Sequence, residues 1–219
     1  MLNTTLLAGM EGFAPKKPVQ EASSMDIVRV TAEYIEPSRS AKNYCPVFCD
    51  VFPDNRRKFT AYLTGEVRDV NNYVDLLDVL MTATESDEIT IYIDSPGGLI
   101  AAGGLIASAI DHCAGSVKTI ARGFCASAAA LIHSAAKPGL ATVTPFALML
   151  YHMSSHCDQG VSTMIRSRAD AQVKYVNEVL LKKALNDGHI TQNEFDRIQT
   201  GENILVSGPE WVKRTNKDQ

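Results

Sequence analysis

Between residues 58 and 201, the pattern of apolar and polar positions alternates between stretches typical of strands and stretches typical of helices. Runs rich in β-branched and aromatic residues, typical of strands, occupy 58–67, 88–98, 116–123 and 141–152. Apolar residues three or four positions apart, or crowded among small residues, predict helices at 70–86, 99–113, 126–136, 162–187 and 191–201. Strands and helices that alternate in this way predict an α/β fold with largely parallel strands.

Two of the predicted helices carry further signals. The helix at 70–86 is predicted to be amphipathic. Its apolar face is formed by residues at a three-to-four spacing: Val70, Val74, Leu77 and Met81. The long helix at 162–187 is followed by Gly188, which is placed to end it as a C-terminal cap. These signals support the helical interpretation of both stretches.

The chain divides into an amino-terminal extension, residues 1–45, and one domain, residues 46–219. The extension mixes Pro, Lys, Glu and Ser without periodicity, so we expect a flexible segment or a propeptide. The remaining length is sufficient for one domain with a buried core.

Charge and hydropathy exclude several classes of protein. The net charge is −4 and the pI is about 5.7, and no basic run is present, so we expect no nucleic-acid partner. No apolar run approaches the roughly 18 residues of a membrane span, and no basic residue precedes the first apolar residues as in a signal peptide. The five cysteines are odd in number and mostly far apart, which favours reduced thiols and a cytoplasmic protein. His152, His156 and Cys157 cluster as zinc ligands would, but no CxxC-type pair accompanies them, so we expect no metal and no cofactor.

Three features carry candidate chemistry. The predicted strand at 88–98 ends in DSPGG, where two glycines let backbone N–H groups approach a ligand. GFCASAAAL, residues 123–131, places Ser127 where a strand gives way to a helix, so a developing anion there would meet the positive end of the helix dipole. His152 ends an apolar strand and could serve as a base.

Each feature also has a purely structural interpretation. A serine among alanines often packs a helix, a PGG sequence often forms only a turn, and a histidine at a strand end is often solvated. The order and context of the three features favour chemistry over packing.

Five sequence blocks in consecutive order resemble the proteolytic subunit of the Clp protease. They are YLTGEV (62–67), IYIDSPGG (91–98), GFCASAAAL (123–131), LMLYHM (148–153) and LVSGPEWV (205–212). The separations from Gly98 to Ser127 and from Ser127 to His152 also match that family. The resemblance implies a crotonase-like α/β fold, in which 162–187 would be a protruding handle helix.

The resemblance also implies a serine peptidase that cleaves unfolded polypeptides inside a chamber of stacked rings of identical subunits. Ser127 would be the nucleophile and His152 the general base. The backbone N–H groups of Gly98 and Ala128 would form the oxyanion hole. The segment that holds a bound peptide as an added strand would include Gly97, Leu99 and Ile100.

The third catalytic position departs from the family, because Asn203 stands where an acid is usual. An asparagine can orient the imidazole but supplies no charge, and an Asp-to-Asn change in a serine triad costs about 10⁴ in rate. Glu202 and Asp196 are the alternatives. A catalytically weak or inactive ring subunit is therefore the second hypothesis for function, and a crotonase-like enzyme acting on a thioester is the third.

The resemblance further implies a partner, an AAA+ unfoldase that docks on aromatic pockets between subunits. Tyr92 keeps one aromatic residue of such a pocket, whereas Thr90 and His112 stand where aromatic residues are usual.

Overall fold

The computed structural model describes residues 45–153, 170–171 and 173–215. The predicted extension at 1–45 lies outside these residues except for Cys45, and so does the first part of the predicted handle helix. Cys45, Cys49, Cys113 and Cys125 carry free thiols. No helix among the described residues is long and apolar enough to cross a membrane.

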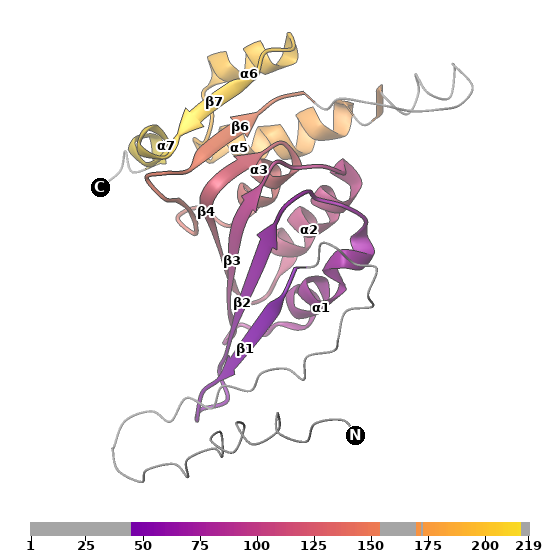
Figure 1. The fold of residues 1–219 in the computed structure, drawn as a ribbon, viewed down its shortest axis with the longest axis vertical. Helices are drawn as coiled ribbons and strands as arrows, with labels where there is room; N and C mark the ends of the chain where they lie inside the picture. Colours follow the sequence, from indigo (N-terminus) through magenta and orange to yellow (C-terminus); the bar gives the residue numbers. More distant parts are fainter. Residues whose placement is uncertain (1–44, 154–169, 172, 216–219) are drawn as a thin grey trace, which may run out of the picture.

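One mixed sheet organises the described residues, with strand order β1-β2-β3-β4-β6-β7 and β5 beside β4 (Figure 1). Its strands are β1 (Val47–Val51), β2 (Arg57–Thr64), β3 (Glu88–Ser95), β4 (Ser116–Ala126), β5 (Ala141–Val143), β6 (Leu148–Tyr151) and β7 (Ile204–Ser207). Neighbours from β2 to β6 are parallel, and the two edge strands β1 and β7 are antiparallel. The predicted α/β class with a parallel centre is confirmed.

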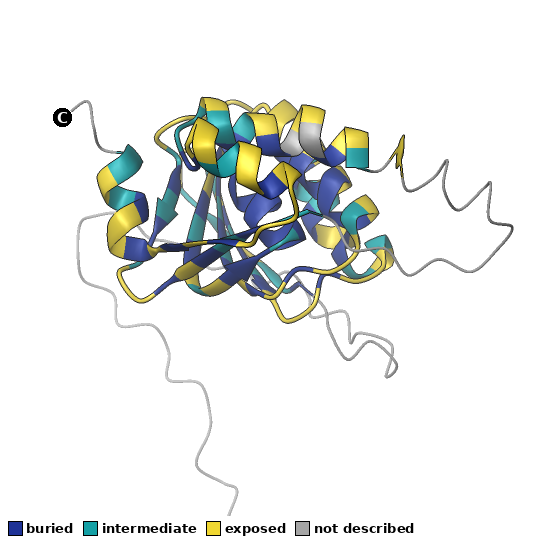
Figure 2. Cartoon of the chain, turned by 90° about the horizontal axis from the view of Figure 1, so that it is seen from above, coloured by how far each residue is buried: buried dark blue, intermediate teal, exposed yellow. Residues whose placement is uncertain are grey.

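Helical segments connect the strands. They are η1 (Val70–Tyr73), α1 (Val74–Thr82), α2 (Ile100–His112), α3 (Ala128–His133), η2 (Val176–Leu181), α5 (Lys182–Asn186), α6 (Gln192–Gln199) and α7 (Gly208–Thr215). Figure 1 shows α1 and α2 on the same side of the central strands. Every second residue of β2 and β3 is buried, and Figure 2 shows the buried residues gathered between sheet and helices.

The helix ends follow sequence rules. Gly188 has φ +75° and ends α5 in a Schellman motif: its N–H donates to Leu185 O at 3.0 Å, and His189 N–H donates to Ala184 O at 2.9 Å. The C-terminal cap predicted at Gly188 is confirmed. Thr191 and Glu194 form a reciprocal capping box at the start of α6.

Two expectations about the core and the sheet are wrong. The face of α1 that the sequence favoured is largely exposed, since Val74 and Met81 are 56% and 78% exposed, whereas Leu76 and Leu80 are buried. Apolar residues recur on both faces of this helix, so spacing alone does not select the buried one.

The stretch at 141–152 is also not one strand. It breaks at Pro145 into β5 and β6, which pair side by side with successive parts of the long β4. Proline donates no hydrogen bond to a sheet ladder, which is why the strand cannot continue through it.

Candidate active site

Ser127 occupies a sharp turn between β4 and α3. Its backbone has φ +55° and ψ −128°, and Asn55 is the other non-glycine residue with positive φ in the described part of the chain. The Ser127 N–H donates to Leu150 O at 3.0 Å, and its carbonyl accepts from Leu131 N–H at 3.2 Å. Serine tolerates this conformation poorly, so its neighbours must hold it there, as is common for functional residues.

The Ser127 hydroxyl does not cap the helix that follows it. A serine at a helix N-cap usually accepts a hydrogen bond from the first turn, but no such bond forms here. The side chain is half-buried. Its hydroxyl therefore remains available for other chemistry.

Glycines surround this turn because backbones approach it closely. A Cβ on Gly97 would lie 2.5 Å from both Ser127 Cβ and Ala126 O, and Gly97 has φ +88°. A Cβ on Gly103 of α2 would lie 3.0 Å from Ala128 Cβ. The small residues around Ser127 thus allow the PGG turn and two helices to meet at one point.

The PGG turn is held by Val67 from the loop after β2. The Val67 N–H donates to Gly97 O at 2.8 Å, and Leu99 N–H donates to Val67 O at 2.7 Å. In the sequence, Val67 shows only as the last residue of a predicted strand. Its neighbour Gly65 marks a turn, but the bridge to Gly98 joins residues too far apart in the chain for periodicity to find it.

The backbone N–H groups of Gly98 and Ala128, on either side of the Ser127 turn, make no backbone hydrogen bond within the described residues. Ala128 is the first residue of α3, where N–H groups are unsatisfied and the dipole is positive. Gly98 has φ +149°, and a Cβ there would lie 2.1 Å from Val67 O. Only glycine fits this position.

His152 directly follows β6, beside the strand that leads to Ser127. Ala126 pairs with Leu150 in the parallel ladder between β4 and β6, so Ser127 and His152 leave neighbouring strands at the same edge of the sheet. Burial lowers the pKa of His152, which favours the neutral ring that a base requires. No hydrogen bond joins the Ser127 hydroxyl to the His152 ring among the described residues; such bonds are often long before substrate binds.

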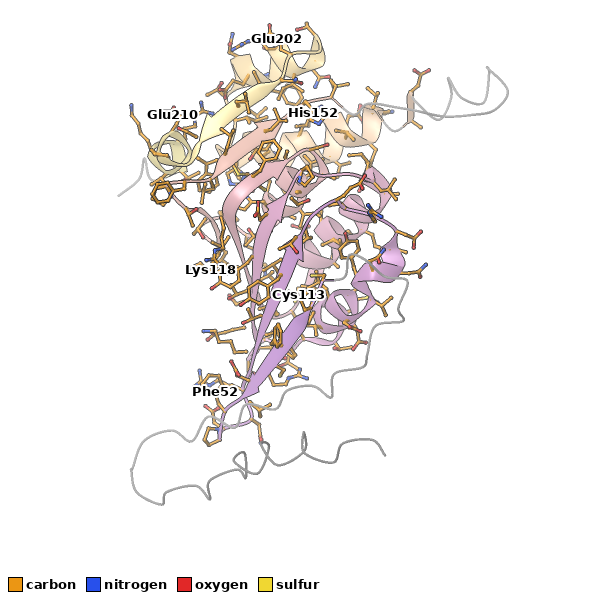
Figure 3. The ribbon with its side chains drawn as sticks, in the orientation of Figure 1. Phe52, Cys113, Lys118, His152, Glu202 and Glu210 are labelled. Carbon is orange, nitrogen blue, oxygen red and sulfur yellow. The ribbon has the colours of Figure 1, made fainter. Side chains whose placement is uncertain are left out.

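The antiparallel ladder between β6 and β7 bears on the third catalytic position. Tyr151 pairs with Ile204, and one further step along this register sets His152 opposite Asn203. Figure 3 marks His152 beyond β6 and Glu202 before β7.

Asn203 and both of its alternatives are exposed, but the two carboxylates have other partners. The Glu202 carboxylate accepts from Arg197 Nε at 2.8 Å, and Asp196 accepts from Gln192 Nε2 at 2.8 Å. The register and these contacts favour Asn203 as the residue beside His152, and its catalytic role stays a prediction.

Within the parts of the chain that the structure covers, no group of three or more His, Cys, Asp or Glu residues could hold a metal ion. His156 and Cys157, which would complete the zinc site considered with His152, lie outside the described residues.

A comparison with known protein families matches the chain to the model of the Clp protease family over residues 50–204. The matched range contains the PGG turn, Ser127, His152 and Asn203. It ends before the LVSGPEWV block at 205–212.

Proposed function

The chain belongs to the Clp protease family of ClpP-like peptidases, and from this premise we propose that it is a serine endopeptidase. Its substrates are unfolded polypeptides, cleaved inside a chamber of stacked rings of this chain. The observation that carries the proposal is the strained backbone of Ser127 at a strand-to-helix turn, beside His152 and two unpaired N–H groups.

Catalysis begins when a substrate carbonyl reaches the Ser127 hydroxyl. The neutral His152 ring takes the hydroxyl proton as Oγ forms a bond to the carbonyl carbon. Negative charge then develops on the carbonyl oxygen, where the Gly98 and Ala128 N–H groups donate to it. One such donor is worth about 10²–10³ in rate.

The tetrahedral intermediate collapses when His152 returns its proton to the leaving amine. Water then attacks the acyl-enzyme with His152 again acting as base, and the Ser127 hydroxyl is regenerated. Asn203 orients the ring by accepting the Nδ1–H with its side-chain carbonyl, which leaves Nε2 to face Ser127. A neutral partner stabilises the imidazolium less than a carboxylate does.

Substrate binds as an extended strand along Gly97 and Leu99, as far as Ile100, where α2 begins. Val67 pairs with one edge of this segment, and the peptide adds to the other. Leu99 is 55% exposed and is available to contact a substrate side chain.

An AAA+ unfoldase is the partner that supplies unfolded chains. Its docking site includes the exposed sheet face around Tyr92, whose ring stacks on Tyr62 at 5.3 Å under the Arg122 guanidinium. Thr90 and His112 still depart from the aromatic residues usual there. Val179 of η2 is 51% exposed, which supports contact of this helical segment with another subunit.

Fluorophosphonate labelling tests the proposal. The probe should modify Ser127, and Ser127→Ala should remove both labelling and cleavage of a fluorogenic peptide. Ser108→Ala is the matched control, because Ser108 is an exposed serine of α2. Undiminished turnover by Ser127→Ala at an unchanged sedimentation coefficient refutes the proposal.

A second function is favoured by one observation, the neutral side chain of Asn203 opposite His152. In that case the chain is a ring subunit with little or no turnover. Labelling of Ser127 without measurable peptide hydrolysis is the outcome that identifies it.

A further inference from the structure

Five buried side chains form a cluster behind the candidate site, each at most 4% exposed. The cluster contains His133, Ser134, Tyr151, His189 and Trp211, and we call it the histidine cluster. The two histidines are the only buried ones in the described part of the chain. No step of the proposed reaction uses either of them.

The rings of the cluster are in direct contact. The Trp211 indole meets His133 edge to face, with centroids 5.4 Å apart, and lies 4.8 Å from the His189 ring. His189 Nδ1 lies 2.9 Å from Ser134 Oγ, which in turn lies 3.4 Å from the Tyr151 hydroxyl. Ring packing is therefore the main contact, and the bond to Tyr151 is long and weak.

The tautomer of His133 follows from its partner. Nε2 lies 2.9 Å from the Thr142 carbonyl, which can only accept, so Nε2 carries the hydrogen. Nδ1 then holds a lone pair, and it is buried without a hydrogen-bond partner among the described residues. Protonation would bury a charge and an N–H that has no acceptor.

The charged groups around the cluster disfavour imidazolium as well. The carboxylates on the helices that pack nearby are already paired with cations: Asp187 with Lys183, and Glu194 and Glu210 with Arg214. Arg214 Nη1 also approaches His189 O at 3.5 Å. The Tyr151 hydroxyl and the Cys125 thiol are buried, and burial raises both pKa values, so neither supplies an anion. Burial lowers the pKa of His133 to about 3, and burial with the Lys183 charge lowers that of His189 to about 4.

The cluster joins the three segments that carry the proposed catalytic residues. His133 and Ser134 end the helix that Ser127 begins, and Tyr151 immediately precedes His152. His189 and Trp211 flank the segment of α6 and β7 that contains Asn203. The cluster lies at the opposite end of α3 from Ser127, and at the same end of β6 as His152.

We propose that His133 and His189 are positioning residues, whose neutral rings clamp the carboxyl-terminal segment and its Asn203 onto the helix and strand that hold Ser127 and His152. The catalytic half of this inference rests on the proposed peptidase function. The clamp itself does not, because it is a packing arrangement. Acidification that protonates the rings therefore opens the clamp.

Trp211 is the only tryptophan in the chain, so its fluorescence reports on the clamp directly. His133→Gln retains a donor for the Thr142 carbonyl, and His189→Asn retains a polar partner for Ser134, but neither titrates. Acidification from pH 7 to 4 should quench and red-shift the wild-type emission, and the emission of the double variant should stay constant over the same range. His112→Asn, at an exposed histidine of α2, should behave as wild type.

Repeating the fluorescence experiment in Ser127→Ala separates the clamp from the proposed peptidase function. The inactive variant should show the same transition, because the clamp needs no turnover. A flat wild-type profile, or an equal transition in the double variant, overturns the clamp whether or not the chain is a peptidase. If the double variant does not fold, the fluorescence profile of wild type is compared with that of the single variant His189→Asn. An equal transition in these two proteins overturns the clamp.

Peptidase kinetics test the positioning role. Protonation of His152 alone gives an acid limb of slope one in log kcat/KM against pH, and clamp opening should raise the wild-type slope toward about two or more. The double variant should return to slope one. His189→Ala should lower kcat with little change in KM, and His189→Asn should restore it. Equal slopes in wild type and double variant overturn the positioning role.

Discussion

Gly97→Ala tests whether the close approach of the PGG turn shapes Ser127, the proposed nucleophile. The added methyl would lie 2.5 Å from Ser127 Cβ and from Ala126 O, and 3.0 Å from Ala128 N. Carbon atoms in contact normally lie about 3.5–4.0 Å apart, so the turn and Ser127 must separate by about 1 Å. Two of the three atoms belong to backbone, so no rotamer change relieves the overlap.

Two effects of the substitution can be separated by magnitude. Positive φ strains an alanine by about 1–2 kcal/mol, and overpacking adds about 1–3 kcal/mol of lost stability. A displacement of about 1 Å at a reacting group costs roughly 10² in rate. We therefore expect kcat/KM for a fluorogenic peptide to fall about 100-fold, with a lowered urea midpoint.

Gly139→Ala is the matched control for strain alone. Gly139 has φ +81°, close to the +88° of Gly97, but a Cβ there meets nothing within 4 Å. This variant should lose stability through strain and retain its kcat/KM. Wild-type turnover in Gly97→Ala, or equal loss of turnover in both variants, would refute the role given to the close approach.

Three further predictions concern charge. Asn203→Asp should raise kcat/KM about 10-fold or more, since loss of the carboxylate costs about 10⁴ in a full triad. Asn203→Ala should lower kcat/KM. If both variants keep the wild-type rate at fixed pH and equal oligomeric state, Asn203 is not part of the site. The folded-state pKa values of His133 and His189 are lowered, so the unfolded chain takes up protons first below about pH 6.5, and stability should fall by about 1.4 kcal/mol per pH unit for each histidine. Urea midpoints at pH 7 and 5 measure this loss, and a midpoint independent of pH would contradict it. Arg57→Ala should destabilise the fold by about 2–3 kcal/mol, because Asp87 is 1% exposed and would lose the cation it pairs with. In urea unfolding, Arg57→Lys should recover part of this loss. Unchanged stability in Arg57→Ala would contradict a stabilising role for the ion pair.

The pattern of apolar residues predicts most of the fold because periodicity reflects local geometry. The parallel centre of the sheet follows from the alternating segments, the end of α5 follows from Gly188, and the helix predicted at 191–201 contains α6. Which face of α1 is buried does not follow, because apolar residues lie on both sides and packing against the sheet selects Leu76 and Leu80. Contacts between distant segments decide such choices.

The break at Pro145 shows the same limit within the sheet. Proline marks a point where a ladder cannot continue, but it does not say whether the chain ends a strand or bulges. The answer depends on β4, whose eleven residues are long enough to pair first with β5 and then with β6. The length of a partner strand is information that the local sequence of 141–152 does not contain.

The residue at the predicted third catalytic position depends both on local sequence and on the pairing of distant strands. Sequence spacing left Asn203, Glu202 and Asp196 as alternatives, since a shift of a few residues near a strand start changes which one faces a histidine. The ladder between β6 and β7 removes that freedom, because Tyr151 pairs with Ile204 and a shift by one residue would turn every side chain of β7 to the opposite face. Val206, which is fully buried, would then be exposed. The burial of Ile204 and Val206 in β7 therefore favours the register that sets a neutral amide, and not a carboxylate, opposite His152.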